Sequence, residues 1–339
     1  MGGQLTIADL AARLGISKAS VSYALNDQPG VSPETRERVR RLARELGWFP
    51  SSSARALSRA RTGAIGLVLS RDPELLGNEP FFMRVISGIE QVLIEADVAL
   101  VLRMVGAAPG RDLRVYERWA GERRVDGVIL FDAQQDDPRF PLMERLGLPA
   151  VLHGSPVAAA SMSSVSGDEA DDAARVVDHL HGLGHRHIAH VTGPQTYLHE
   201  QLRQRLVGAR AAGVGIRVDV RPGDYSLQGA RRVTAELLRT PEPPTGIIYG
   251  SDLMALGGLD AAAELGVAVP GRLSLVSWDD SILCQVARPD VTGLERHPGD
   301  FGRMSATVLL EVIAGRGPGD VVVGPSDLMV RGTSGPAPS

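Results

Sequence analysis

Short apolar runs that alternate with helical periodicity along most of this 339-residue chain constrain its fold more than any other feature. When a helix connects two strands of a sheet, the second strand runs parallel to the first. The pattern therefore predicts parallel sheets that helices cover on both faces. Ligands of such sheets bind at the carboxyl ends of the strands. The predicted strands are residues 64–70, 98–105, 125–132, 149–154, 187–193, 246–250 and 273–279.

The part of the chain that carries this pattern, residues 63–339, is too long for one hydrophobic core and predicts two lobes. The alternation breaks at a small polar stretch over residues 161–166 and again at residues 289–293. We expect the chain to cross between the lobes at these breaks, which leaves a ligand cleft. Lobe one is predicted at about 63–163 and 292–324, and lobe two at about 164–291 and 325–333.

Residues 6–26, TIADLAARLGISKASVSYALN, have the pattern of two short helices that are joined by a glycine turn. Thr6 with Asp9 forms a capping box at the start of the first helix. Gly15 permits a tight reversal, and Ser17 can cap the second helix. The second helix then presents a small, polar face, which is typical of a helix-turn-helix that reads DNA. An ordinary helical hairpin is the alternative.

A third helix follows and favours the helix-turn-helix interpretation. Ser32 caps it, Pro33 occupies its first turn and Gly47 ends it. Its apolar stripe completes a small three-helix domain over residues 1–49. Residues 50–62 have too few apolar positions to fold alone and are predicted as a hinge helix and linker.

Charge separates the head from the rest of the chain. Residues 1–62 carry ten basic and five acidic side chains, a net charge of +5, whereas the remaining residues carry 26 and 35, a net charge of −9. A positive head on a negative body favours a polyanionic ligand at the head, through phosphate contacts and release of counterions. A solvated basic helix face is the alternative explanation.

Composition and motifs narrow the class of protein further. The first ten residues show no basic start that leads into an apolar segment, and no apolar run approaches membrane-spanning length. Cys284 is the one cysteine, so no intrachain disulfide can form. The chain has no phosphate-binding loop, Gly-x-Ser-x-Gly elbow or His-Glu-x-x-His motif. We therefore expect a cytoplasmic protein that is not an enzyme, uses no cofactor and does not bind membranes.

Five of the eight histidines lie close together in the sequence, which raises the possibility of a metal site. Their spacing fits no single helix face, and no carboxylates are interleaved with them. We interpret them as core or solvated side chains and expect no metal. These histidines are His179, His181, His185, His187 and His190.

From Thr6 to about Thr333, the chain resembles the transcriptional repressors of the LacI family. The similar segments occur in the family's order and are specific in combination. The resemblance implies a small all-α helix-turn-helix head plus an α/β two-lobed core, similar to periplasmic binding proteins, with two doubly wound parallel sheets. The segments include TIADLAARLGISKASVSYALN, VSPETRERVRRLARELGW, PSSSARAL, NEPFFMRVISGIE, RRVDGVIL, HLHGLGHRHIAHVTGP, RLVGARAAG and SDLMALGGLDAAAELGVAVPGRLSLVSWDDS.

The resemblance implies DNA-contacting roles for residues of the head. Lys18, Ala19 and Ser22 match positions that face base edges in the major groove. Tyr23 stands where several family members carry Arg, and a tyrosine cannot make the bidentate contact to guanine. The other implied contact residues have hydroxyl or amide side chains that suit phosphates. They are Thr6, Ser17, Ser20, Asn26 and Ser32.

In the linker, Ser51, Ala54 and Leu57 match the hinge helix of the family. The family's hinge leucine inserts into the minor groove between base steps and kinks the duplex, which implies this role for Leu57. Packing within a helix is the alternative role for Leu57. Ser51 stands where Asn is usual, and either side chain can cap a short helix.

The resemblance also implies an effector site in the cleft. Aromatic faces suit the apolar side of a pyranose, while a carboxylate and a guanidinium suit its paired hydroxyls. Asp252 can instead serve only as the N-cap of the helix that it begins, although the two roles are compatible. The implied effector-binding residues are Phe81, Phe82, Asp132, His153, Arg205, Tyr225, Asp252, Trp278 and Arg296.

The resemblance implies a homodimer, with a tetramer as the alternative, that binds a palindromic operator in double-stranded DNA as a repressor. A small carbohydrate is the expected effector, and a purine or nucleoside is the alternative. Two other classes of protein remain open. A solute-binding protein is opposed by the basic head and by the lack of a signal sequence, and an enzyme on this scaffold would need a catalytic constellation that the sequence does not show.

Overall fold

The computed structural model describes residues 5–48, 61–71, 79–106, 108, 110–157, 160–317 and 319–338. The chain divides into two compact units, Met1–Thr62 and Gly63–Ser339. Within the described ranges, no helix is both long and apolar enough to cross a membrane. The predicted hinge residues Ser51, Ala54 and Leu57 lie outside the described residues.

The first unit contains the three predicted helices around one small core. Leu10, Val21, Ala24 and Val39 are fully buried and come from all three helices. The caps are those that the sequence predicts: a capping box begins the first helix, and serine hydroxyls accept from backbone NH groups at the starts of the other two. The helices are α1 (Ile7–Leu14), α2 (Lys18–Leu25) and α3 (Pro33–Glu45).

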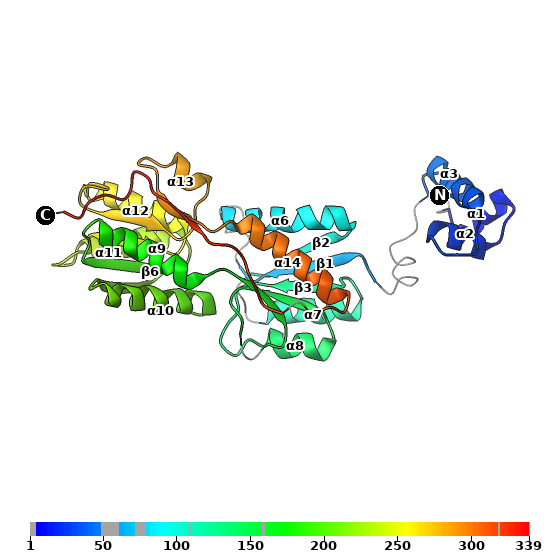
Figure 1. Cartoon of the computed structure of the whole chain (residues 1–339), viewed down its shortest axis with the longest axis horizontal. Helices are drawn as coiled ribbons and strands as arrows, with labels where there is room; N and C mark the ends of the chain where they lie inside the picture. The colour runs from blue at the N-terminus through cyan, green and yellow to red at the C-terminus, as the bar shows by residue number, and fades with distance from the viewer. Residues whose placement is uncertain are drawn as a thin grey trace. The chain divides into compact units, whose positions relative to one another are not determined.

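The second unit contains two sheets, each between two pairs of helices (Figure 1). In lobe one all strand pairs are parallel, in the order β11-β5-β4-β3-β1-β2. Helices α7 and α8 cover one face and α6 and α14 cover the other. The elements are β1 (Ala64–Leu69), α6 (Pro80–Ala96), β2 (Ala99–Met104), α7 (Arg111–Gly121), β3 (Gly127–Leu130), α8 (Arg139–Leu146), β4 (Ala150–His153), β5 (Ser163–Ser166), α14 (Pro298–Ile313) and β11 (Val321–Val322).

Lobe two repeats this design, with strand order β12-β10-β9-β8-β6-β7 and one antiparallel pair, β10 with β12. Helices α9 and α10 cover one face and α11 and α12 cover the other. The two sheets confirm the predicted α/β core. The elements are α9 (Glu169–Gly182), β6 (His187–Thr192), α10 (Leu198–Gly213), β7 (Arg217–Pro222), α11 (Leu227–Leu238), β8 (Gly246–Tyr249), α12 (Asp252–Glu264), β9 (Ser274–Ser277), α13 (Ile282–Val286), β10 (Thr292–Glu295) and β12 (Asp327–Met329).

The first two crossings between the lobes lie a few residues later than the sequence predicts, and the third lies between β11 and β12, at the predicted boundary. The serine-rich stretch at 163–166 is the largely buried strand β5, which pairs with β4 and β11 in lobe one. Strand β10 pairs with β9, so residues 292–295 belong to lobe two. The chain therefore crosses after β5, after β10 and again between β11 and β12. The sequence did not predict strands β5 and β10, because their serine and threonine residues interrupt the apolar run that indicates a buried strand.

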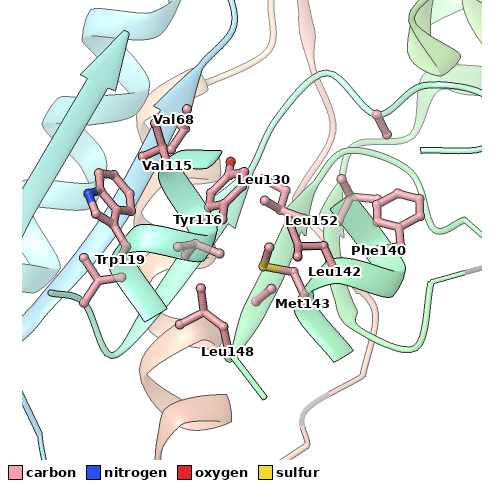
Figure 2. Close-up of a cluster of buried hydrophobic side chains, with 14 of the residues drawn as sticks. Val68, Val115, Tyr116, Trp119, Leu130, Phe140, Leu142, Met143, Leu148 and Leu152 are labelled. Carbon is pink, nitrogen blue, oxygen red and sulfur yellow. The ribbon is translucent and has the colours of Figure 1, made fainter. Parts of the chain in front are cut away.

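The core of lobe one shows how a helix packs on its sheet (Figure 2). Tyr116 and Trp119 of α7 are buried among residues of the sheet and of α8. The indole of Trp119 lies over Gly66 of β1, where an added Cβ would come within 2.4 Å of the ring. A glycine in the middle of this strand therefore makes room for the largest side chain of the cluster.

Helices α6 and α14 approach so closely that their contact requires glycine. A Cβ at Gly302 would lie 2.0 Å from the carbonyl oxygen of Val85, and a Cβ at Gly88 would lie 1.9 Å from that of Gly299. These obstacles are backbone atoms, which cannot rotate away as a side chain can. The pair of helices is thus held at one separation, and α6 carries residues of the cleft at its first turn.

The C-terminal segment packs on lobe two, although its composition predicts a loose tail. Arg331 donates from both terminal nitrogens to the Asp280 carboxylate at 2.7 Å, and Thr333 is fully buried. His185 lies 3.2 Å from the carbonyl oxygen of Gly335. Specific hydrogen bonds therefore hold a segment that has few apolar side chains.

The clustered histidines make separate local contacts. His179 Nε2 lies 2.9 Å from Ser334 Oγ, and His187 Nε2 lies 3.0 Å from an Asp219 oxygen. His190 is fully buried. Across the part of the chain that the structure describes, no three histidine, cysteine or acidic side chains form a group that could hold a metal.

The contact between α6 and α14 leads to a prediction about stability. Gly302→Ala should lower the free energy of unfolding by about 2 kcal/mol, because an overpacked core displaces backbone. Gly208→Ala, in the interior of α10 with nothing within 4 Å, is the matched control and should be neutral or stabilising by up to about 1 kcal/mol. Urea unfolding of both variants measures the difference, and equal effects would contradict the packing account.

Candidate functional site

The outer face of α2 is the first candidate site. Lys18 and Ala19 are exposed, Ser22 is half-buried and Tyr23 is 42% exposed, whereas Val21 of the same helix is fully buried. The residues that the sequence predicts at base edges therefore share the side of α2 that does not pack on the head's core. A helix in this setting can enter a major groove.

The predicted phosphate-contacting side chains all serve as caps or local ties within the head. Ser17 Oγ accepts from Ser20 NH at 3.0 Å, and Ser32 Oγ accepts from Thr35 NH at 3.2 Å. The Thr6 hydroxyl bonds to Asp9, and the Asn26 amide donates to the carbonyl of Ser22. Their hydroxyls stand at helix N-termini, where the helix dipole also favours an anion.

Other contacts fix the orientation of α2 relative to α3. Arg36 and Arg40 of α3 both pair with Asp27, at 3.0 and 2.5 Å, in the loop that follows α2. Trp48 Nε1 donates to the carbonyl of Leu5 at 2.7 Å and joins the two ends of the head. Arg36 and Arg40 thus stabilise the fold of the head and also contribute to its positive charge.

The second candidate site is a cavity between the two lobes of the core, which we call the inter-lobe cavity. It holds about 740 Å³ of empty space, part of it open to solvent, and lies at the carboxyl ends of strands from both sheets. Lobe one contributes Arg71, Glu79, Phe81, Phe82, Phe131, Asp132, His153, Gly154, Ser166, Gly167 and Phe301, and the rest comes from lobe two or from the crossings: Glu169, His199, Arg203, Tyr225, Gly250, Ser251, Asp252, Asp279 and Arg296.

Arg71, directly after β1, is the central cation of the cavity. Its Nε and Nη2 donate to the two oxygens of Asp132, both at 2.9 Å, and its Nη1 lies 3.3 Å from Glu79. The guanidinium also lies over the rings of Phe82 and Tyr225, at 4.7 and 4.8 Å from their centroids. Because Phe82 belongs to lobe one and Tyr225 to lobe two, Arg71 joins the lobes inside the cavity.

Arg203 of α10 is the corresponding cation of lobe two. It donates to both oxygens of Glu169, at 2.9 and 3.2 Å, and to Glu200 at 3.0 Å. Burial raises the pKa of Glu169, but the Arg203 charge outweighs burial and keeps that pKa below its usual value. Glu200 also accepts from the Tyr225 hydroxyl at 2.7 Å, so the ionic network holds an aromatic ring in place.

A third group of charges lies where β8, β9 and β10 end. Arg296 donates to Asp279 at 2.5 Å and lies over the ring of Phe81. Asp252 accepts from the NH of Leu253, and burial together with the neighbouring Asp279 raises its pKa to about 6. Among the described residues no arginine forms an ion pair with Asp252, whose carboxyl lines the cavity and hydrogen-bonds to the side chain of Ser281.

Two further groups respond to burial in the cavity. Burial raises the pKa of Glu79 to about 7, in spite of the nearby Arg71. Burial and then the charge of Arg296 lower the pKa of His153 to about 3, so this imidazole is neutral at physiological pH. The ring of His153 stacks on Phe131 at 4.2 Å and extends the aromatic wall of the cavity.

Two residues of the cavity wall have a left-handed backbone conformation, which residues other than glycine seldom adopt. Asp132 has φ +55° and Tyr225 has φ +62°. Such conformations cost on the order of 1 kcal/mol each and persist where the surrounding structure enforces them. The strain lies on the residues that contact Arg71 from either lobe.

Further contacts between the lobes lie around the cavity. Arg84 of α6 donates to the carbonyl of Asp280 at 2.7 Å and to Glu295 at 2.8 Å, both in lobe two. The NH of Leu198 donates to the carbonyl of Ala133 at 2.8 Å. These bonds favour the arrangement of the lobes in this structure, and a change in that arrangement must break them.

The structure brings together seven of the nine predicted effector residues and corrects two. Arg205 is exposed on α10 and does not line the cavity; Arg203, two positions earlier and so on the opposite side of the helix, does. Trp278 is fully buried behind Arg203, whose guanidinium lies 5.4 Å from its ring centroid. Ser251 rather than Asp252 is the N-cap of α12. The seven are Phe81, Phe82, Asp132, His153, Tyr225, Asp252 and Arg296.

Comparison with known proteins covers both units of the chain. Residues 6–51 match the model of bacterial regulatory proteins, lacI family, and residues 177–334 match that of the periplasmic binding protein-like domain. The HTH-type transcriptional regulator CelR of Thermobifida fusca is 32% identical over 320 residues, which cover 91% of this chain and 92% of CelR.

Solved structures agree with these matches. The structure of a transcriptional regulator CelR–cellobiose complex is 30% identical, covers 97% of this chain and 99% of its own, and has a TM-score of 0.75. The Lac repressor dimer bound to operator and the anti-inducer ONPF is 24% identical, with coverage of 98% and 100% and a TM-score of 0.85. At this identity, the likeness to the Lac repressor shows the fold alone.

His190, fully buried behind the cavity against Trp278, leads to a prediction about acid stability. Burial lowers its pKa to about 4, whereas an unfolded histidine has a pKa near 6.5. Between these values the unfolded chain binds a proton that the folded chain does not, so acidification destabilises the fold. As the pH falls from 6.5 to 4.5, the free energy of unfolding of the parent should decrease, relative to that of His190→Phe, by up to about 1.4 kcal/mol per pH unit.

Urea unfolding at a series of pH values measures this difference. The comparison isolates His190, because the acidic groups of the cavity titrate equally in both proteins. Parallel curves for the parent and His190→Phe would show that the imidazole is not held neutral by burial.

Proposed function

The chain belongs to the LacI family of bacterial regulatory proteins, and we propose that it is a repressor whose affinity for a palindromic operator is switched by a small carbohydrate. Proteins of this family are DNA-binding regulators and not enzymes. The observation that carries the proposal is a helix-turn-helix head with an exposed recognition face, in one chain with a two-lobed core that encloses a polar and aromatic cavity.

The head supports sequence-specific binding of double-stranded DNA. Lys18, Ala19 and Ser22 lie on the outer side of α2, where we assign them to base edges, and Tyr23 stands where several family members carry an arginine. The net charge of +5 over residues 1–62 supplies phosphate contacts, whereas the core, at −9, repels DNA. Specific reading is thus confined to the head.

A homodimer is supported by apolar side chains that remain exposed on the core. Met83 and Ile94 of α6 are 53% and 71% exposed, and Leu102 lies on the edge strand β2 next to them. In lobe two, Ile282 and Val286 of α13 are also exposed. Helices α6 and α13 lie along the same side of the core (Figure 1), so one partner core can cover both.

The chemistry of the inter-lobe cavity favours a carbohydrate as the effector. Phe81, Phe82 and Tyr225 offer aromatic faces, and Asp252 and Arg296 offer a carboxylate and a guanidinium in the same lining. This combination suits the apolar face and paired hydroxyls of a sugar. The CelR–cellobiose complex, 30% identical and similar over nearly the whole chain, is a relative with a sugar bound. A purine or nucleoside is the alternative ligand.

The proposed switch couples the cavity to DNA through the relative orientation of the lobes. An effector that binds one arrangement of the lobes more tightly shifts the population toward it. In a dimer this shift moves the two hinges relative to each other and changes operator affinity, with Leu57 as the wedge in the minor groove. A protein that regulates chromosomal genes acts in the cytoplasm.

The head leads to a prediction about DNA binding. Selection from a pool of random duplexes should give a near-palindromic consensus that the full chain binds, with about a thousandfold loss of affinity between 50 and 200 mM salt. The separate core from Gly63, a compact unit of its own, should not bind the consensus. Gel shifts measure both, and full affinity of the core alone would contradict the assignment of DNA reading to the head.

The cavity leads to a prediction about effector binding. A thermal-shift screen of cellobiose, other disaccharides, sugar phosphates and adenosine should identify a sugar that stabilises the protein. At one hundred times its Kd, this sugar should raise the free energy of unfolding by about 2.7 kcal/mol. Asp252→Asn keeps the acceptor for the NH of Leu253 but removes the charge. The affinity for that sugar, measured by calorimetry, should fall at least tenfold.

Asp260→Asn, on the exposed face of the same helix, is the matched control and should bind as the parent does. Equal affinity of Asp252→Asn and the parent would remove Asp252 from the site. Stabilisation by adenosine and by none of the sugars would favour the alternative effector.

A further inference from the structure

A second groove lies on lobe one, away from the inter-lobe cavity, and arginines dominate it. Arg103 comes from β2 at the edge of the sheet, and Arg111, Arg114 and Arg118 come from α7. The α7 arginines are three and four positions apart, so they share one face of the helix. Met104, Val105, Gly106 and Val115 complete the lining. None of these residues belongs to the inter-lobe cavity.

No carboxylate among the described residues pairs with these guanidinium groups. Among the described residues, Arg103, Arg114 and Arg118 make no side-chain hydrogen bond or ion pair, and Arg111 donates only to the carbonyl of Val105, at 3.4 Å. The core as a whole carries excess acid, so this concentration of unpaired positive charge runs against its composition. Four like charges in one groove repel one another unless an anion lies between them.

The acidic residues of α7 are directed to other arginines. Asp112 lies 4.0 Å from Arg139, and Glu117 lies 3.3 Å from Arg145. Both partners belong to α8, on the side of α7 away from the groove. Helix α7 therefore has one face on which charges are paired and one on which they are not. The unpaired face begins at the N-terminus of the helix, where the dipole adds further positive potential.

The groove is distinct from the apolar surface that we assign to dimer contacts. Side chains alternate along β2, so Arg103 and Leu102 point to opposite faces of the sheet. Val101 and Val105 pack with the α7 side, whereas Leu100 and Met104 pack with the α6 side. A partner core that covers α6 and Leu102 thus leaves the α7 face open.

We propose that this groove binds a small phosphorylated ligand, at a second site that is separate from the effector cavity. Guanidinium groups match the geometry of phosphate oxygens in pairs, and four of them suit a phosphate ester or a diphosphate. The valines at the base of the groove provide an apolar contact for the organic part of such a ligand. The recess favours a small molecule over a duplex, which presents a convex surface.

Calorimetry of the full chain with inorganic pyrophosphate, at constant ionic strength, tests the proposal. We expect one pyrophosphate per chain, and at least tenfold weaker binding by the double variant Arg114→Gln, Arg118→Gln. The control Arg272→Gln, Arg316→Gln removes the same charge from exposed positions outside the groove and should bind as the parent does. Glycerol 3-phosphate in place of pyrophosphate tells a monoester from a diphosphate ligand.

The melting temperature without anion gives a second readout. Because removal of two charges relieves repulsion, Arg114→Gln, Arg118→Gln should melt above the parent, and pyrophosphate should raise the melting temperature of the parent alone. No binding above the salt blank, or equal loss in the control variant, would overturn the proposal. Dissociation of the dimer in the groove variant, with pyrophosphate binding unchanged, would also overturn it and would assign the groove to the partner core.

Discussion

The Arg71 guanidinium is the group on which the arrangement of the core depends. It is held by the two oxygens of Asp132, contacts Glu79, and lies between the rings of Phe82 and Tyr225. An arginine in such a position cannot be left without its partners, because an uncompensated buried charge costs about 3–5 kcal/mol. The arrangement of the lobes in this structure supplies one of those partners, the Tyr225 ring.

The other charges of the cavity follow the same principle. Arg203 is paired with Glu169 and Glu200, and Arg296 is paired with Asp279. Each arginine is therefore neutralised before a ligand arrives, and paired side chains are held in fixed positions. A ligand with hydroxyl groups can then bond to groups whose orientation is already set, which reduces the entropy cost of binding.

Much of the architecture could be predicted from local signals. Helix caps at Ser17 and Ser32 located the helices of the head, and apolar runs located seven strands. Strands β5 and β10 were missed because serine, threonine and glycine give them no apolar run. Their pairing is decided by neighbouring strands far away in the sequence, which a local pattern does not contain.

The cavity was predictable in part for a similar reason. Asp132 just after β3 and Phe82 in the first turn of α6 follow from the fold and from the family's motifs. Arg71 was missed because its role depends on Asp132, 61 positions away in the sequence, and Glu79 was missed with it because Glu79 pairs with Arg71. The choice between Arg203 and Arg205 depends on which face of α10 meets the cavity, and the motif alone did not settle it.

Operator affinity of an Arg71→Met variant, without effector, tests most directly whether the contacts inside the cavity set the state of the DNA-binding head. Fluorescence anisotropy with the selected palindromic duplex gives the Kd of variant and parent. We expect the two to differ by at least about fivefold, the lower end of typical coupling between sites. Equal Kd values, with the folded core intact by circular dichroism, would contradict the coupling of lobe arrangement to DNA binding.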